Sequence, residues 1–177
     1  MSGPKFNRPY YLSNDHIACI SKLTYDIVQT VVPEVDSSYI PHAVDGDIFK
    51  TIDKDTVKTF KDSKGLDGKF VCFWNNRNAR RKQSGTVLWW FKDFLDKVGH
   101  DKATFIMHTD IKDQHGQDLE AIIQELGLTN GEVLFSREKV QATDLAMMYN
   151  VADVTLNIAD AEGFGLATLE SLSCGTP

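Results

Sequence analysis

The strongest constraint on the fold is a regular alternation of apolar runs and amphipathic helical patterns in the second half of the chain. The run KFVCFW at 69–74 is continuously apolar, as expected for a strand that is covered on both faces. Helical spacing follows at 86–98, where four apolar residues share one face. These residues are Leu88, Phe91, Leu95 and Val98. This order of elements predicts a parallel sheet with helices on both faces.

The same order of strand and helix repeats along the rest of the chain. Gly127 falls near the end of one predicted helix, where glycine commonly terminates helices. Thr143 is the predicted N-cap of another. We expect strands at 103–108, 131–136 and 153–159, and helices at 117–128, 143–152 and 165–173. The sequence therefore predicts an α/β, Rossmann-like fold with four strand–loop–helix units.

A shorter pattern of the same kind precedes this region. HIACIS at 16–21 predicts a buried strand, and 22–32 has helical spacing with Leu23, Ile27 and Val31 on one face. Pro33 ends this helix. A second short strand is expected at 37–41, and a polar helix or loop with a glycine exit at 55–68.

Composition excludes several classes of protein. The formal net charge of −6 argues against non-specific nucleic-acid binding as the main activity. No apolar stretch approaches the ~20 residues that span a bilayer, and the N-terminus lacks the apolar middle of a secretory signal. The three cysteines are far apart, so we expect reduced, mostly buried thiols in a cytoplasmic protein. Their spacing supports neither a disulfide framework nor a zinc site.

Ligands of a parallel α/β sheet bind beyond the carboxyl ends of its strands. This rule selects the loops at 75–85, 108–116, 136–142 and 158–165. The last of these contains AEGFG, in which Gly163 and Gly165 permit a close approach of ligand to backbone. The amides that follow, up to Leu166, would form a helix N-terminus that binds phosphate.

Two glutamates accompany this glycine loop. Glu162 lies before the loop and Glu170 lies within the helix that follows it. Carboxylates accept hydrogen bonds from hydroxyls but cannot neutralise phosphate, which suggests a ligand with both phosphate and sugar. The alternative is a simple turn with two surface glutamates.

Positive charge is concentrated in the first loop, NNRNARRKQSG. Arg77, Arg80, Arg81 and Lys82 leave the end of the central strand. Arginine matches phosphate geometry with its planar fork, and lysine adds a point charge. Alone, such a cluster is usually a solvated surface or a weak nucleic-acid patch. At the same sheet edge as a glycine loop, it predicts a diphosphate clamp.

The two remaining loops carry weaker signals. Residues 107–118 hold five histidines and aspartates that could be read as metal ligands, although acidic residues before a helix explain several of them. Only His108, at the end of its strand, is expected near a ligand. In the loop at 136–142, Arg137 and Val140 are candidates for contact with a nucleotide base. A plain connecting loop is the alternative there.

Four segments together resemble glycosyltransferase family 4. EGFGLATLESLSCGTP (162–177) resembles the signature EGFGLP-x-x-E-A-x-A-x-G-x-P, with its two glutamates at the same separation. YIPHAVDGDIF (39–49) is similar to IPHGVD-x-x-x-F, and NNRNARRKQ (75–83) to GR-x-x-x-x-K. VLFSREKVQATDLAMMYNVADV (133–154) is similar to VxFxG…eLxxxYxxADV. The order and spacing of all four match, from about residue 16 onward.

The resemblance implies a retaining transferase of the GT-B fold, of hexosyltransferase type, that uses a UDP- or GDP-linked sugar and no metal or other cofactor. Arg77 and Lys82 would hold the donor diphosphate, and Glu162 would contact the transferred sugar; these three are the implied catalytic residues. The amides of Gly163, Phe164, Gly165 and Leu166 would lie against sugar and phosphates. Glu170 would accept hydrogen bonds from ribose hydroxyls.

The main departure from the family pattern is that large parts of the family's proteins have no counterpart in this chain. Residues 1–36 resemble only the last part of the N-terminal domain, and 37–177 resemble a donor-binding domain that stops in mid-motif. We therefore expect a fragment that is nearly inactive alone, because the acceptor saccharide or other acceptor would bind the N-terminal domain. Ala43, Ala167 and Ser171 replace common family residues, which are mild changes.

Two other functions fit the same residues. One is a non-catalytic nucleotide-sugar-binding module that acts through a partner. The other is a nucleic-acid-binding domain that uses the stretch from Arg77 to Lys82, which the acidic net charge and the absence of interleaved aromatic residues disfavour.

Overall fold

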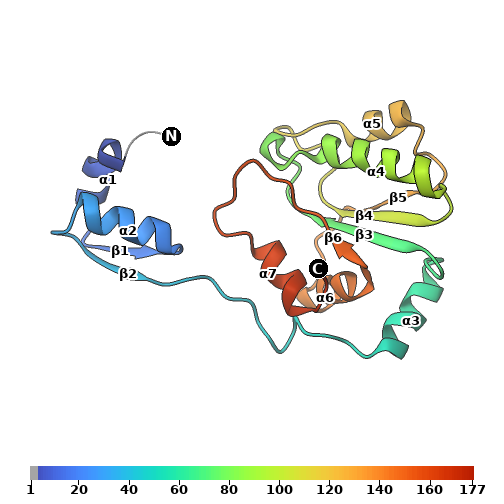
Figure 1. The fold of residues 1–177 in the computed structure, drawn as a ribbon, viewed down its shortest axis with the longest axis horizontal. Coiled ribbons are helices and arrows are strands. Elements are labelled where there is room, and N and C mark those ends of the chain that lie inside the picture. The colour runs from blue at the N-terminus through green and yellow to red at the C-terminus, as the bar shows by residue number, and fades with distance from the viewer. Residues whose placement is uncertain (1–3) are drawn as a thin grey trace. The chain divides into compact units, whose positions relative to one another are not determined.

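The chain forms two compact units, Met1–Ala43 and Val44–Pro177, in a computed structural model that describes residues 4–177 (Figure 1). The predicted boundary after residue 36 falls within strand β2 (Asp36–Tyr39). This strand pairs in parallel with β1 (His16–Cys19) along its whole length, from His16 with Asp36 to Cys19 with Tyr39. The ladder ties the residues of β2 to the first unit, so the units divide after Ala43.

The first unit packs one helix on this two-stranded sheet. Its elements are η1 (Pro4–Asn7), α1 (Arg8–Leu12), β1, α2 (Lys22–Val31) and β2. Ser21 caps α2, since its hydroxyl accepts the amide of Thr24 at 3.1 Å. The buried residues are Cys19, Val28, Val31, Val32 and Val35. The expectation that Leu23 shares the buried face was wrong, because the buried stripe of α2 starts at Val28 and leaves Leu23 72% exposed.

The second unit is built on a four-stranded sheet in the order β5-β4-β3-β6, and all its pairs are parallel. The strands are β3 (Phe70–Asn75), β4 (Ala103–His108), β5 (Val133–Ser136) and β6 (Val154–Thr155). β6 is shorter than the predicted 153–159. Beyond Leu156 the backbone leaves the ladder, and the amide of Asp160 instead donates to the carbonyl of Arg81 at 2.8 Å.

Helices cover both faces of this sheet, as predicted (Figure 1). The helices α4 (Ser84–Val98) and α5 (Leu119–Leu126) pack on one face, where Trp74, Phe105 and Met107 are fully buried. The other face carries Phe73 and is covered by α6 (Ala142–Val151), with α3 (Lys54–Ser63) and α7 (Leu166–Ser173) beside it. The α/β fold class is confirmed.

Two details of the helices differ from the predictions. Val98 is 42% exposed, because α4 ends there and Gly99 turns the chain with φ 107°. Thr143 lies inside α6, whose N-cap is Gln141 with an extended backbone and no side-chain cap. Gly127 does end α5 in the left-handed conformation, with φ 69°.

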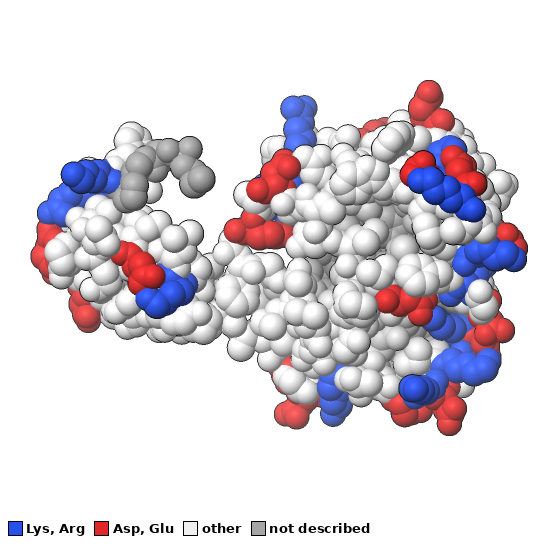
Figure 2. Space-filling view, in the orientation of Figure 1, with Lys and Arg blue, Asp and Glu red and all other residues white. Residues whose placement is uncertain are grey.

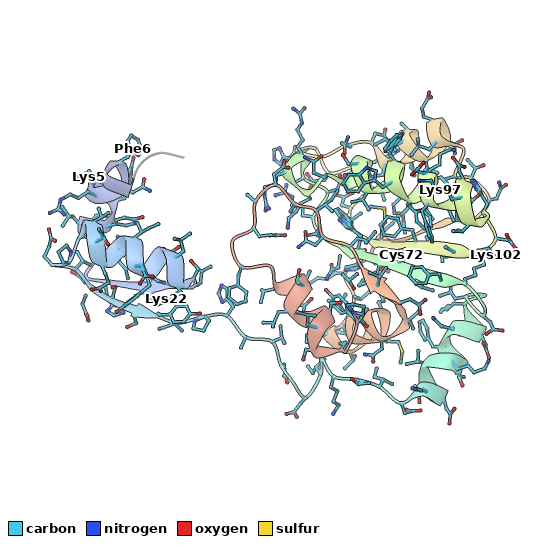
Figure 3. All side chains as sticks on the ribbon, in the orientation of Figure 1. Lys5, Phe6, Lys22, Cys72, Lys97 and Lys102 are labelled. Carbon is cyan, nitrogen blue, oxygen red and sulfur yellow. The ribbon has the colours of Figure 1, made fainter. Side chains whose placement is uncertain are left out.

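The three cysteines are free and buried, as expected. Cys72 lies on β3 within the sheet (Figure 3), and burial, reinforced by the charge of Asp153, raises the pKa of its thiol to about 12. Such a thiol is unreactive at neutral pH. Within residues 4–177, no helix has the length and apolarity needed to cross a bilayer.

Candidate functional site

The carboxyl ends of the four parallel strands meet at one edge of the sheet, and the four predicted loops lie there. A hollow of about 310 Å³ opens between the residues that follow β3, β4 and β5. It is lined by predicted and unpredicted residues together, among them Arg77, His108, Arg137, Asn75, Asn76 and Thr109. The structure thus gathers three of the predicted ligand-binding residues around one space.

The ion pair between Lys82 and Glu162 joins the first loop to the last. Lys82 belongs to a 3-10 turn, η2 (Arg80–Lys82), and is only 6% exposed. Its ammonium donates to Glu162 Oε1 and to Asn76 Oδ1, the latter at 2.7 Å. Asn76 also lines the hollow, so the residues predicted to bind phosphate and sugar meet beside it.

Several further contacts hold these two loops together. Gln83 takes the left-handed conformation, with φ 58°, and its side-chain amide donates to both carboxylate oxygens of Asp160. Arg81 donates to the carbonyl of Ala161 at 2.7 Å and lies 3.8 Å from Glu162. These contacts explain why segments about 80 positions apart in the sequence form one site.

The carboxyl group of Glu162 is held in its charged form. Partial burial favours the neutral form, but the hydrogen bond and charge of Lys82 outweigh it, with help from Asn157 and Arg81. The pKa of Glu162 therefore lies below its ordinary value. Asn157 Nδ2 donates to Glu162 at 3.3 Å and also contacts Thr168 Oγ1 at 3.2 Å, which links the glutamate to the first turn of α7.

The glycine loop leads directly into α7. Gly165 is the N-cap residue of this helix and has φ 87°, a conformation that favours glycine. Gly163 has open space around its α-carbon. Phe164 is half-buried, and Leu166 is exposed at the first helical position. The N-terminal amides of α7 are thus at the same sheet edge as Lys82, where an anion could accept from them.

Glu170 does not lie on the solvent face of α7. Tyr149 of α6 donates its hydroxyl to Glu170 Oε2 at 2.7 Å and accepts from Asn75 Nδ2 at 2.8 Å. Burial raises the pKa of Glu170, against the opposing effect of the tyrosine hydrogen bond. Asn75 lines the hollow, so this chain of hydrogen bonds connects Glu170 to it.

The other predicted residues have partners within the protein. Arg77 forms a two-point ion pair with Asp113, His108 Nδ1 lies 2.8 Å from Ser136 Oγ, and Arg137 pairs with Glu120 at 3.2 Å. Burial lowers the pKa of His108, so its imidazole is neutral at pH 7. Val140 is half-buried in the same loop as Arg137.

Two asparagines and a tyrosine, none of them predicted from the sequence, connect these groups. Asn75 donates to the buried Tyr149, which donates to Glu170, whereas Asn76 accepts from Lys82, which pairs with Glu162. Two adjacent asparagines at the end of an apolar central strand were the available signal. Across the described residues, no three His, Cys, Asp or Glu side chains gather as a metal site would require.

The architecture is that of glycosyltransferases with the GT-B fold, whose C-terminal-like part this chain matches. No protein-family model matches the chain. It is 26% identical over 166 residues to an alpha-monoglucosyldiacylglycerol synthase of Streptococcus pneumoniae, and the match covers 92% of this chain and 36% of that enzyme.

Solved structures show the same fold. HepE of Anabaena, crystallised with UDP and glucose, matches with a TM-score of 0.73 at 19% identity, over 98% of this chain and 47% of HepE. WaaG, a glycosyltransferase of lipopolysaccharide biosynthesis, matches with a TM-score of 0.74 at 17% identity, over 93% and 43%. The chain thus spans about a third to a half of the proteins that it resembles.

Proposed function

We propose that this chain is the donor-binding domain of a retaining glycosyltransferase, which transfers a sugar from a UDP- or GDP-linked donor to a saccharide or another acceptor. The observation that carries this proposal is the contact of Lys82 with Glu162 at the carboxyl edge of the sheet. A cation for phosphate and an acceptor for sugar hydroxyls meet there, beside a helix N-terminus and a hollow of about 310 Å³.

In this proposal the cations act on the donor diphosphate. Arg77 and Lys82 bind its oxygens and stabilise the negative charge that grows on the leaving nucleotide, which is an electrostatic form of catalysis. Arg77 contributes a planar fork and Lys82 a point charge. Since Lys82 is paired with Glu162, donor binding would exchange part of that pair for phosphate.

We assign the contacts with the transferred sugar to Glu162 and the contacts with the ribose of the nucleotide to Glu170. The charged carboxylate of Glu162 accepts hydrogen bonds from hydroxyls of the transferred sugar. The amides of residues 163–166 face sugar and phosphate. Glu170 has one oxygen engaged by Tyr149, and among the described hydrogen bonds its other oxygen, Oε1, has no partner. That oxygen is the proposed acceptor for ribose hydroxyls.

The nucleotide base is assigned to the hollow between the β4 and β5 loops. The neutral imidazole of His108 lies there, and the guanidinium of Arg137 stacks 5.9 Å from the ring of Phe135. Val140 adds apolar contact nearby. The presence of UDP and glucose in the crystal of HepE supports a uridine donor, while GDP remains within the proposal.

The test is a thermal-shift and calorimetric screen of the 177-residue chain against UDP, GDP, ADP and their sugars. A ligand that binds only the folded state raises the free energy of unfolding by RT ln(1 + [L]/Kd). We expect UDP or GDP to raise the melting temperature, and Arg77→Ala to reduce the shift. Absence of any shift with all three nucleotides would contradict the proposal.

Transfer activity separates this proposal from a non-catalytic binding module. We expect little transfer by the chain alone, because the family resemblance of the sequence implies that the acceptor binds an N-terminal domain. Activity should appear when such a domain is supplied. Robust transfer by the isolated chain would contradict the first expectation, and inactivity of a competent two-domain protein would favour the binding module.

A further inference from the structure

Asp113, in the loop after β4, is the partner of the exposed Arg77. Arg77 donates to it through Nε at 2.6 Å and through Nη2 at 3.2 Å, so one edge of the guanidinium is engaged. The side chain of Arg77 is 60% exposed, whereas that of Asp113 is only 10% exposed. A shielded carboxylate therefore holds an accessible arginine at the rim of the hollow.

The backbone fixes Asp113 independently of Arg77. Its Oδ1 accepts the amide of His115 at 2.8 Å, and the amide of Gly116 donates to its carbonyl at 2.8 Å. These bonds define a tight turn. The hydrogen bonds of Arg77 and His115 hold the pKa of Asp113 at about 2, so it is charged throughout the neutral range.

A buried asparagine joins this turn to the loop that carries Arg77. Asn78 is fully buried, donates to the carbonyl of Gln117 at 2.7 Å and accepts from Ser84 Oγ at 2.8 Å. The two loops approach so closely that a Cβ on Gly116 would lie 1.9 Å from the Asn78 carbonyl oxygen. Only glycine fits there, so the separation of Arg77 and Asp113 is set by packing and not by their own attraction.

This arrangement fixes the orientation of the arginine before an anion binds. A free arginine loses rotamer freedom when it binds, which weakens association. Here Asp113 engages Nε and Nη2, and Nη1 makes no hydrogen bond among those described, so it remains for a second acceptor. Planar two-point contacts of this kind fix the orientation of the guanidinium.

We infer that Asp113 is a positioning residue, which holds Arg77 in the orientation that binds the diphosphate of the nucleotide ligand. The inference rests on the proposed function, because it names the support of one of its phosphate ligands. The opposite role is conceivable on charge alone, since a carboxylate could compete with phosphate for Arg77. The two roles predict opposite effects when Asp113 is removed.

The experiment measures UDP and uridine binding to the full chain by titration calorimetry in a double-mutant cycle of Asp113→Ala and Arg77→Ala. We expect Asp113→Ala to weaken UDP binding about five- to tenfold, with uridine binding unchanged, because uridine carries no phosphate. In the Arg77→Ala background, Asp113→Ala should have no further effect. Asp113→Asn, which keeps an oxygen acceptor, should restore most of the affinity.

Asp93→Ala is the charge-matched control, because Asp93 is an exposed carboxylate on α4 that pairs with Lys97 at 2.6 Å and does not line the hollow. It should not weaken UDP binding. Tighter UDP binding by Asp113→Ala would show competition and overturn the inference. An equal loss of UDP affinity on Asp113→Ala in the unmodified chain and in the Arg77→Ala variant would also overturn the inference. It would indicate a general loss of structure.

Two further measurements keep the inference falsifiable if Asp113→Ala folds poorly. Gly116→Ala, which disturbs the junction between the loops, should weaken UDP binding more than uridine binding. NMR of the Arg77 Nε–H group in the ligand-free chain should show slow exchange, and Asp113→Asn, which keeps an oxygen acceptor, should retain most of that protection. Fast exchange in the unmodified chain would overturn the inference, whereas binding of none of the nucleotides would instead overturn the proposed function.

Discussion

Lys82 is the residue on which the candidate site depends most directly. Its ammonium is nearly enclosed and has two partners, Glu162 and Asn76, from different loops. Removing one member of such a pair leaves the other carboxylate partly buried and uncompensated, which costs more than the pair contributed. The side chain of Glu162 is still 28% exposed, so water relieves part of that cost.

For Lys82→Ala we expect the free energy of unfolding to fall by about 2 kcal/mol, and UDP affinity to fall about tenfold or more. Denaturant melts and calorimetry measure the two effects. Lys92→Ala is the control, because Lys92 forms an i,i+4 pair with Asp96 on the outside of α4. It should cost less than about 0.5 kcal/mol and leave binding unchanged. Equal effects of both substitutions would contradict the role given to Lys82.

The electrostatic environments of Glu162 and Glu170 shift the pKa values of these two carboxyl groups in opposite directions. The pKa of Glu162 is lowered, because Lys82 outweighs burial, so this carboxylate stabilises the fold above its unfolded pKa of about 4.5. The pKa of Glu170 is raised by burial, so its charge costs stability at neutral pH. A carboxylate that destabilises the fold is typical of a residue kept for binding.

We therefore expect opposite pH signatures from the two glutamine variants. Glu162→Gln should lower the melting temperature at pH 7, and the difference should begin to shrink as the pH falls below about 4.5, toward the lowered pKa of the folded state. Glu170→Gln should raise the melting temperature at pH 7, with the gain also fading as the pH falls toward 4.5. Thermal melts across this range, at constant salt, measure both. A stabilising Glu162→Gln or a destabilising Glu170→Gln would contradict the assignments.

At the scale of the element, the start of α7 depends on a single backbone conformation. Gly165 is left-handed, with φ 87°, while the nearby Gly163 has no positive φ and no crowding around it. The left-handed turn at Gly165 immediately precedes the first helical residue, Leu166. The helix is only the eight residues Leu166–Ser173 long, so it depends on this start and on its packing.

Replacement of Gly165 by alanine should cost about 1–2 kcal/mol, because an L-residue is strained in the left-handed region. Gly163→Ala is the matched control in the same loop and should change the free energy of unfolding by less than about 0.5 kcal/mol. Denaturant titration of the two variants measures the difference. Equal costs would show that the loop conformation described here does not govern the start of α7.

At the scale of the whole molecule, the chain consists of two units with separate cores. The first has a small valine-rich core around α2, and the second has two larger clusters on either side of the four-stranded sheet. Units with their own cores commonly unfold separately. Every residue assigned to the ligand lies in the second unit. The visible face of that unit mixes acidic and basic side chains without a large patch of one sign (Figure 2).

Differential scanning calorimetry should consequently resolve two transitions. Addition of UDP should raise the temperature of the transition that belongs to Val44–Pro177 and leave the other unchanged. The larger enthalpy identifies the second unit, because enthalpy scales with the number of residues. One cooperative transition, or equal shifts of both, would contradict the assignment of the site to the second unit.

The strand and helix pattern was predictable because it depends on local periodicity. The largely buried strands β3 and β4 carry mostly apolar runs, and the strands of the second unit were expected near their observed positions. The errors fall where local pattern and tertiary packing disagree. Leu23 has helical spacing but lies outside the buried stripe, and Thr143 has a capping side chain but is already the second residue of α6.

The sequence by itself determined the fold class and the loops that could carry a ligand, because both follow from periodicity and the parallel order of strands. It also supplied the charged residues. Only the tertiary structure decided their partners, Glu162 with Lys82, Glu170 with Tyr149 and Arg77 with Asp113. These pairs join residues 21 to 80 positions apart. Contacts at such separations depend on how the loops pack against each other, and no local pattern records that.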